Sequence, residues 1–197
     1  MARMKTGRSE TPGRVRIIGG TLRGSVLAVP MRAGLRPTPG RVRETLFNWL
    51  QPHIAGAHCL DLFAGSGALG IEALSRGAAT ACFVERDAGL AAALRDDLAR
   101  LHQTDAQVCH ADALEFLAGS PSHPYDMVFL DPPFARDLWA NVADLLEAPG
   151  WLAPQAWIHV EMPGGTDFAP PPPWIMHRQG RAGEVRHVLY RRCQPIH

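Results

Sequence analysis

The stretch LDLFAGSGALGIEAL, residues 60–74, decides how this 197-residue chain folds. Within it, Gly65-Ser66-Gly67-Ala68-Leu69-Gly70 spells G-x-G-x-x-G, which is typical of a strand, a tight turn and a helix that bind a nucleotide-like cofactor. Glycine lets the backbone approach a ligand closely. An acid, Asp61, precedes the first glycine by four residues, and a carboxylate beside a helix start repels a pyrophosphate. The loop therefore predicts a cofactor site that favours positive charge.

Strand-like apolar runs alternate with helix-like runs around this loop. We expect strands at 57–62, 80–85, 106–110, 125–130 and 155–161, and helices at 67–76, 87–102, 112–118 and 136–147. Such alternation predicts an α/β fold with a mostly parallel, doubly wound sheet covered on both faces. Two more strand candidates, 172–177 and 184–192, are joined by the hairpin-like connection HRQGRAGEV, so the sheet should finish with an antiparallel pair.

The segment before the loop has a different pattern. Residues 1–13 are polar and without periodicity, which predicts a mobile basic arm, and residues 14–30 predict a two-stranded hairpin. In residues 36–50 the apolar positions form one face of a helix, with Thr38 as its N-cap and Pro39 at its first position. We therefore divide the chain into the arm 1–13, a hairpin-and-helix extension 14–50 and a catalytic domain 51–197.

The charge is distributed unevenly although the net charge is only +1. Residues 1–50 carry a balance of +8, residues 51–170 a balance of −11 and residues 171–197 a balance of +4. A basic head and a basic tail around an acidic middle predict a polyanion-binding face built from the two ends. The alternative is an ordinary solvated surface with chance clustering.

The composition excludes several classes of protein. Hydrophobic residues make up 46% and charged residues 20%, as expected for a folded domain and not for a disordered chain. We expect no membrane span and no secretory signal, because long apolar runs are missing from the sequence. Four cysteines without a C-x-x-C pair predict buried free thiols in a reducing cytoplasm, and the scattered histidines predict no metal site. Nothing in the sequence requires more than a monomer.

Two more acids follow the next two strand-like runs. Glu85, twenty residues after Gly65, is placed to accept hydrogen bonds from ribose hydroxyls. Asp112 opens a helix-like run, where it accepts from an adenine amino group or serves only as a helix N-cap. S-adenosylmethionine carries a positive sulfonium and a positive ammonium and lacks phosphate. The acidic positions therefore favour S-adenosylmethionine over NAD.

The second decisive motif is DMVFLDPPF, residues 126–134, an apolar strand that ends in Asp131-Pro132-Pro133-Phe134. Two prolines stop the strand and remove two N–H donors, so the local groups are acceptors. A group of hydrogen-bond acceptors suits the exocyclic amine of a nucleobase, which donates two hydrogens, and Phe134 would stack on the base ring. We expect direct in-line methyl transfer, in which Asp131 and the Pro132 carbonyl bind the amine and stabilise its developing charge. The alternative is a strand-terminating turn with a core phenylalanine.

These motifs, together with RIIGGTLRG and RPTPGRVRETLFNWL before them, resemble the bacterial 16S ribosomal RNA guanine-N2 methyltransferase family over about residues 14–192. The resemblance implies a Rossmann-like class I methyltransferase fold, with a seven-stranded sheet, an antiparallel last strand and an N-terminal β-hairpin. It implies S-adenosylmethionine as donor, S-adenosylhomocysteine as product and no metal. The implied acceptor is the N2 amine of guanine 966 in 16S rRNA, as free RNA or in the small ribosomal subunit.

The resemblance also implies roles for individual residues. The cofactor-binding residues are Asp61, Phe63, Ala64, Gly65, Ser66, Gly67, Glu85, Arg86, Asp112 and Ala113. The catalytic residues are Asp131, Pro132, Pro133 and Phe134. We expect RNA phosphates to be bound by Arg14, Arg16, Arg23, Arg36, Arg41 and Arg43, with help from Arg178, Arg181 and Arg186. The chain departs from the family pattern at Asp97-Leu98, where the family commonly has Asn-Leu. Any role of the asparagine side-chain amide is therefore open in this chain.

Three other functions remain as alternatives. D-P-P-[FYW] also serves adenine-N6 methyltransferases that act on DNA. An NAD-dependent oxidoreductase uses the same glycine pattern, although this chain has no second substrate domain and no use for D-P-P-F in that chemistry. A non-catalytic RNA-binding or assembly factor would keep the fold, but the intact Asp131 tetrapeptide argues against it.

Overall fold

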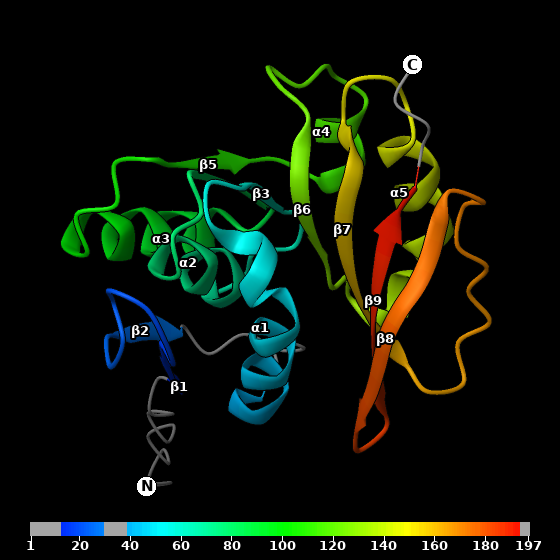
Figure 1. The fold of residues 1–197 in the computed structure, drawn as a ribbon. Coiled ribbons are helices and arrows are strands. Elements are labelled where there is room, and N and C mark those ends of the chain that lie inside the picture. Colours follow the sequence, from blue (N-terminus) through cyan, green and yellow to red (C-terminus); the bar gives the residue numbers. More distant parts are fainter. Residues whose placement is uncertain (1–12, 30–38, 194–197) are drawn as a thin grey trace, which may run out of the picture.

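The structure is a computed structural model that describes residues 13–29 and 39–193. It contains a seven-stranded sheet with helices on both faces and a separate two-stranded sheet (Figure 1). The strands of the large sheet are β3 (His58–Asp61), β4 (Thr80–Glu85), β5 (Ala106–His110), β6 (Tyr125–Leu130), β7 (Leu152–Pro163), β8 (Trp174–Ala182) and β9 (Val185–Arg192). Their order is β5-β4-β3-β6-β7-β9-β8. Strands β3 to β7 are parallel and β9 is antiparallel to both of its neighbours, which confirms the predicted fold class.

The order of the strands reverses between β3 and β6. The chain runs from β3 outward to β4 and β5, and then returns to the other side of β3 to form β6 and β7. In open α/β sheets, ligands bind outside the carboxyl ends of the strands where the order reverses in this way. The two predicted motifs follow β3 and β6, so both lie at this point.

Helices cover the two faces of the sheet unequally. They are α1 (Gly40–Ile54), α2 (Ala68–Ser75), α3 (Ala88–Arg100), α4 (Ala113–Leu117) and α5 (Trp139–Leu146), with a 3-10 turn η1 (Phe134–Arg136). Buried residues of α1, α2 and α3 share one core cluster with the two-stranded sheet, and buried residues of α4 and α5 form the other. None of the helices among the described residues is long and apolar enough to cross a membrane.

The N-terminal hairpin pairs β1 (Gly13–Arg16) with β2 (Val26–Val29) in an antiparallel ladder, as predicted. Val15 and Leu27 are buried in the core cluster of α1 to α3. The Asp97 carboxylate on α3 accepts the Ala28 N–H of β2 at 3.2 Å. The residue that departs from the family pattern therefore attaches the hairpin to the large domain.

Several boundaries differ from the sequence-based expectation. Strand β8 extends to Ala182, so most of the expected connection HRQGRAGEV is strand, and the turn is confined to Gly183 and its neighbour. Strand β7 runs over 152–163, beyond the expected 155–161 at both ends. Helix α1 starts at Gly40, one residue after Pro39. It continues beyond residue 50 to Ile54, whose side chain is buried in the core. Thr38, the expected N-cap, lies outside the described residues. All four cysteines are free, but only Cys59 and Cys82 are buried as predicted, whereas Cys109 is half-buried and Cys193 is exposed.

Candidate active site

The glycine loop (65–70) has the geometry that its sequence predicts. Gly65 and Gly67 have φ values of 52° and 71°, which side-chain-bearing residues rarely adopt. At Gly70 the requirement is space, because a Cβ atom there would lie 2.3 Å from Cε1 of Phe83 on β4. Helix α2 can therefore pack directly on the sheet, and its first turn faces the carboxyl end of β3.

Asp61 ends β3 under this loop, with 4% of its surface exposed. Its carboxylate Oδ2 accepts the Gly70 N–H at 3.2 Å, and the Phe63 backbone also donates to it. Burial raises the pKa of Asp61 to about 7, although the hydrogen bond from Gly70 opposes the shift, and the Glu85 charge raises it further. A cation placed beside Asp61 would restore its ionised form. This position is therefore suited to a positively charged ligand.

Glu85 ends β4 and holds the glycine loop from the other side. Its Oε2 accepts the Gly65 N–H at 2.8 Å and its Oε1 accepts the Asp87 N–H at 2.7 Å. Each carboxylate oxygen has two lone pairs, so two acceptor positions remain for hydroxyl groups such as those of a ribose. The structure thus brings Glu85 to the loop, as predicted.

Asp112 has two partners in the structure. Its Oδ1 accepts the Leu114 N–H at 3.0 Å, so it is the N-cap of α4, one of the two roles left open by the sequence. Its Oδ2 accepts from Nη1 of Arg136 at 2.8 Å, and this hydrogen bond is the main cause that lowers the pKa of Asp112. Arg136 ends η1, directly after the second motif. It was not predicted as a site residue, and it links the start of α4 to the segment that follows the second motif.

The remaining predicted cofactor residues border the same loop and the starts of the following helices. Ala64 is buried and donates its N–H to the Val84 carbonyl at 3.0 Å, whereas Phe63 and Ser66 are half-buried. Arg86 is exposed after β4, and Ala113 is the first residue of α4. Among the described residues, no group of three or more His, Cys, Asp or Glu side chains could hold a metal ion.

The base clamp (131–134) directly follows β6. Burial raises the pKa of Asp131 well above its usual range, and the charges of Glu161 and Asp61 raise it further. Pro132 is buried, but Phe134 is 43% exposed, with its ring centroid 6.0 Å from that of Trp139. An exposed ring beside a half-buried carboxylate is the arrangement expected for stacking on a base whose amine reaches the carboxylate. The alternative of a core phenylalanine is thereby excluded for Phe134.

Glu161 is a site residue that the sequence motifs did not predict. It lies near the end of β7 with 4% of its surface exposed. Its Oε1 is 4.0 Å from Nε2 of His159, a ring that is neutral because burial, with a smaller contribution from His187, lowers its pKa to about 3. The signal was present in the sequence, since the strand QAWIHVE ends in an acid just as the strands of Asp61 and Glu85 do.

The predicted RNA-binding arginines differ in exposure. Arg14, Arg16, Arg23 and Arg41 are exposed on the hairpin, its loop and the start of α1, and Arg178 and Arg181 are exposed on β8. Arg186 is half-buried and donates to the Thr166 carbonyl at 3.2 Å. Arg36 lies outside the described residues. Arg43 is buried, contrary to the expectation that it binds RNA phosphates.

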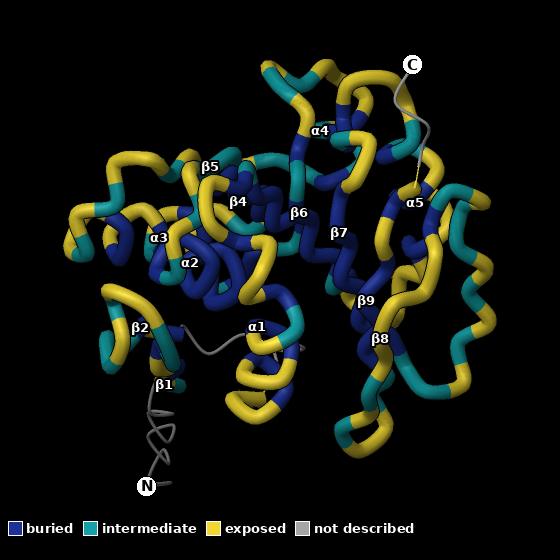
Figure 2. The backbone as a smooth tube through the Cα atoms, in the orientation of Figure 1, coloured by how far each residue is buried: buried dark blue, intermediate teal, exposed yellow. Residues whose placement is uncertain are grey.

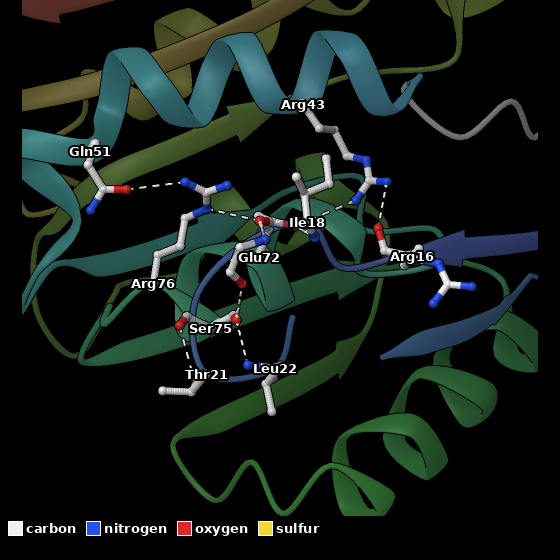
Figure 3. Close-up of polar contacts among 10 residues, drawn as sticks. Arg16, Ile18, Thr21, Leu22, Arg43, Gln51, Glu72, Ser75 and Arg76 are labelled. Atoms are coloured by element: carbon white, nitrogen blue, oxygen red, sulfur yellow. Dashed lines mark hydrogen bonds and ion pairs between the residues drawn. The ribbon is translucent and has the colours of Figure 1, made fainter. Parts of the chain in front are cut away.

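Arg43 is part of a buried network around Glu72 of α2, which is fully buried (Figure 3). The Glu72 carboxylate accepts the N–H groups of Ile18 and Gly19 at 2.8 and 2.7 Å and Nε of Arg76 at 2.9 Å. Nη1 of Arg43 lies 3.7 Å from Oε2 of Glu72, and its Nη2 donates to the Arg16 carbonyl at 2.9 Å. The network joins the loop after β1, the helix α1 and the helix that follows the glycine loop.

Described segments from both basic parts of the chain lie toward the same end of the molecule as the carboxyl ends of β6 and β7. In Figure 1, β6 and β7 end in the lower part of the view. The β1–β2 hairpin, the first turns of α1 and the turn between β8 and β9 also lie in that lower part. Figure 2 shows that each of these three segments contains exposed residues.

Comparisons with known proteins agree with this geometry. The chain matches the family model described as conserved hypothetical protein 95 over residues 15–191. Ribosomal RNA small subunit methyltransferase D of Escherichia coli K12 is 49% identical over 191 residues, which is 96% of either chain. The protein of the same name from Haemophilus influenzae is 44% identical over 181 residues, covering 90% of this chain and 94% of its own length.

Solved structures show the same similarity. A protein from Escherichia coli described as a methyltransferase has a TM-score of 0.85 and 49% identity, covering 93% of this chain and 100% of its own. A protein from Haemophilus influenzae described as a methylase has a TM-score of 0.81 and 40% identity, covering 92% of this chain and 100% of its own.

Proposed function

Because this chain belongs to the family described as conserved hypothetical protein 95 and is 49% and 44% identical to two ribosomal RNA small subunit methyltransferases D, we propose that it methylates 16S ribosomal RNA. The methyl donor is S-adenosylmethionine and the acceptor is the N2 amine of a guanine, position 966 by family resemblance. The observation that carries the proposal is the adjacency of β3 and β6, which sets the acidic glycine loop beside the base clamp.

The acidic side chains around the glycine loop fit this cofactor. S-adenosylmethionine supplies a methyl group on a cationic sulfur atom. Burial and the neighbouring charge of Glu85 raise the pKa of Asp61, so a cation placed beside this carboxyl group favours its ionised form. Glu85 retains acceptor positions for ribose hydroxyls beside the loop. A pyrophosphate would instead add negative charge to this position, which favours the sulfonium cofactor over NAD.

The base clamp supports amino-group chemistry. Asp131 and the Pro132 carbonyl accept the two hydrogens of the base amine, which keeps its lone pair directed at the methyl group. Asp131, ionised beside the cation, stabilises the charge that develops on the nitrogen and takes up the proton that it loses. Phe134 stacks on the base, a contact worth about 1–3 kcal/mol in other base–aromatic pairs. The enzyme thus contributes mainly positioning and electrostatic stabilisation.

The acceptor RNA is held by the exposed arginines. Arg14, Arg16, Arg23 and Arg41 present guanidinium groups for phosphates, and the exposed Arg178 and Arg181 on β8 add two more. A guanine that is stacked or paired must turn out of its helix to reach the clamp, at a cost of a few kcal/mol. We expect the enzyme to act as a monomer in the cytoplasm on 16S rRNA or on the small ribosomal subunit.

Methylation of defined acceptors tests the proposal. Purified protein is incubated with labelled S-adenosylmethionine and either 16S rRNA, a small-subunit particle or duplex DNA, and the nucleosides are identified by mass spectrometry. We expect N2-methylguanosine in the RNA or the particle. N6-methyladenine in the DNA would instead favour the adenine-N6 alternative. In the cell, a deletion strain should lack one N2-methylguanosine of 16S rRNA, and wild-type protein but not Asp131→Ala should restore it.

A further inference from the structure

The side chain beside the catalytic aspartate, on the side away from the glycine loop, is Glu161. Strands β6 and β7 are parallel neighbours, and their register pairs Leu130 with Val160. The next residues in this register are Asp131 and Glu161. Neighbouring strands lie about 4.8 Å apart, so two carboxyl groups stand next to each other at the end of the sheet.

Both side chains point to the same face of the sheet. The rings of Phe129 and His159, two residues earlier on each strand, meet edge to face with centroids 6.4 Å apart. Side chains alternate along a strand, so Asp131 and Glu161 share this face. The Glu161 charge also acts on Asp131, where it is the largest contribution after burial to the rise of its pKa. Asp131 therefore lies between Asp61 on the β3 side and Glu161 on the β7 side.

The backbone and the surroundings hold Glu161 at this point. Its carbonyl accepts the indole N–H of Trp139 at 2.7 Å, and the Trp139 ring in turn lies beside that of the clamp residue Phe134. The neutral His159 ring lies 4.0 Å from the carboxylate. A base whose amine meets Asp131, with the methyl donor on the β3 side, extends its ring toward β7 and so toward Glu161.

The ring atom next to the amine differs among the bases. In guanine, the amine at C2 has N1–H, a hydrogen-bond donor, on one side and N3, an acceptor, on the other. The ring nitrogen next to the amine is N1 in adenine and N3 in cytosine, and both are acceptors. A carboxylate that neighbours Asp131 on the N1 side of the base would therefore accept a hydrogen bond from guanine and would face a lone pair in the other two bases.

We propose that Glu161 is a specificity-determining residue, whose carboxylate accepts the N1–H of guanine while Asp131 accepts the hydrogens of N2. This assignment rests on the proposed function, because it concerns the base that enters the same clamp. It explains how a D-P-P-F clamp that would fit several amines becomes selective for guanine.

The test uses RNA in which the target guanine is replaced by 2-aminopurine, which keeps the N2 amine but has an acceptor at N1. The wild-type enzyme should methylate guanine more efficiently than 2-aminopurine, by about 10- to 100-fold in kcat/KM, since one good base contact has this effect. In Glu161→Gln, the amide oxygen can accept from N1–H of guanine and the amide NH₂ can donate to N1 of 2-aminopurine. The ratio of kcat/KM for guanine to kcat/KM for 2-aminopurine should therefore fall toward one. Affinity for S-adenosylmethionine should stay within about threefold of wild type.

Controls separate this assignment from a structural effect and from the proposed function. Glu115→Gln, an exposed glutamate on α4, should keep the wild-type ratio. If Glu161→Gln melts early, Glu161→Asp, which keeps a shorter carboxylate, should lower the rate but retain part of the preference for guanine. An unchanged guanine-to-2-aminopurine ratio in both active variants would overturn the assignment. Absence of N2 methylation by the wild-type enzyme would count against the proposed function instead.

Discussion

The N–H of Gly70 lies 3.2 Å from Oδ2 of Asp61, so the third glycine of the loop donates a hydrogen bond to the acid that ends the preceding strand. This bond favours the ionised carboxylate, whereas burial disfavours it more strongly. The result is a carboxyl group whose pKa of about 7 lies close to the working pH of the cell. Its charge, and therefore its affinity for a cation, should change near neutrality.

Affinity for S-adenosylmethionine should depend on pH through Asp61. Below about pH 7 the empty protein holds a proton on this group, and binding of the cation requires that the proton leave. We expect the Kd, measured by titration calorimetry, to rise as the pH falls from 8 to 6. Asp61→Asn should bind more weakly at pH 8 and lose most of this dependence. A wild-type Kd that is equal at both pH values would contradict the role of Asp61.

The same substitution should stabilise the empty protein at high pH. A carboxyl group with a raised folded-state pKa binds more protons when folded, so stability falls as the pH rises from about 4 through 7. Asp61→Asn should therefore have a higher Tm than wild type at pH 8, by about 2–4 °C for each kcal/mol relieved, and a similar Tm near pH 4. A lower Tm at pH 8 would show that the carboxylate is needed for folding.

Asp131→Asn should abolish most methyl transfer without loss of cofactor binding. The amide cannot take up the charge and the proton of the amine, and loss of one such stabilising group typically costs about 10²–10³ in kcat. Single-turnover transfer to 16S rRNA measures the effect, and calorimetry checks the cofactor affinity. Asp144→Asn, an exposed acid on α5, is the matched control and should remain active. A fully active Asp131→Asn enzyme would refute the assigned mechanism.

The Glu72 network should be a large contributor to stability. Glu72→Gln leaves the buried Arg43 guanidinium and the Arg76 side chain without their carboxylate partner. Breaking a buried ion pair on one side typically costs about 3–5 kcal/mol, and urea unfolding should show a decrease of that order in the free energy of unfolding. Glu115→Gln on α4 should cost far less because its side chain is exposed. A decrease below about 1 kcal/mol for Glu72→Gln would mean that hydrophobic packing alone docks the hairpin.

Removal of two exposed arginines of the extension should weaken RNA binding and leave the cofactor site intact. In Arg16→Ala/Arg23→Ala, the slope of log affinity against log salt concentration should flatten by about 0.7–0.9 for each phosphate that is no longer neutralised. Arg95→Ala, which removes an exposed arginine bound to the Val108 carbonyl at the β5 edge, should leave the slope unchanged. An equal decrease of RNA and cofactor affinity in the double variant would show that the hairpin only supports the fold.

The sequence predicted the parallel half of the sheet more closely than its antiparallel end. Strands β4, β5 and β6 have the predicted bounds, because each is a short run bordered by polar or turn residues. Strand β8 was too short in the prediction, since Ile175 and Met176 are followed by the polar residues HRQGR, which are typical of a loop. These residues are strand because they pair with β9 at the edge of the sheet, where polar side chains face solvent.

In the candidate site, too, the sequence predicted some features and missed others. Asp61, Glu85 and Asp131 were predictable because a motif or a strand end marks each one. The burial of Arg43 was not, because it depends on pairing with Glu72, which is 29 residues away and lies within an apolar helix. The ion pair between Asp112 and Arg136 likewise joins two loops that no local pattern relates. Pairings of this kind follow from the tertiary arrangement and not from spacing along the chain.

A crystal structure of the complex with S-adenosylhomocysteine tests the central claim most directly. We predict that the ribose hydroxyls bind Glu85, that the ligand amino group lies on the Asp61 side of the glycine loop, and that the sulfur atom faces the clamp formed by Asp131 to Phe134. A ligand bound away from the glycine loop, or a clamp that faces away from the sulfur atom, would contradict it.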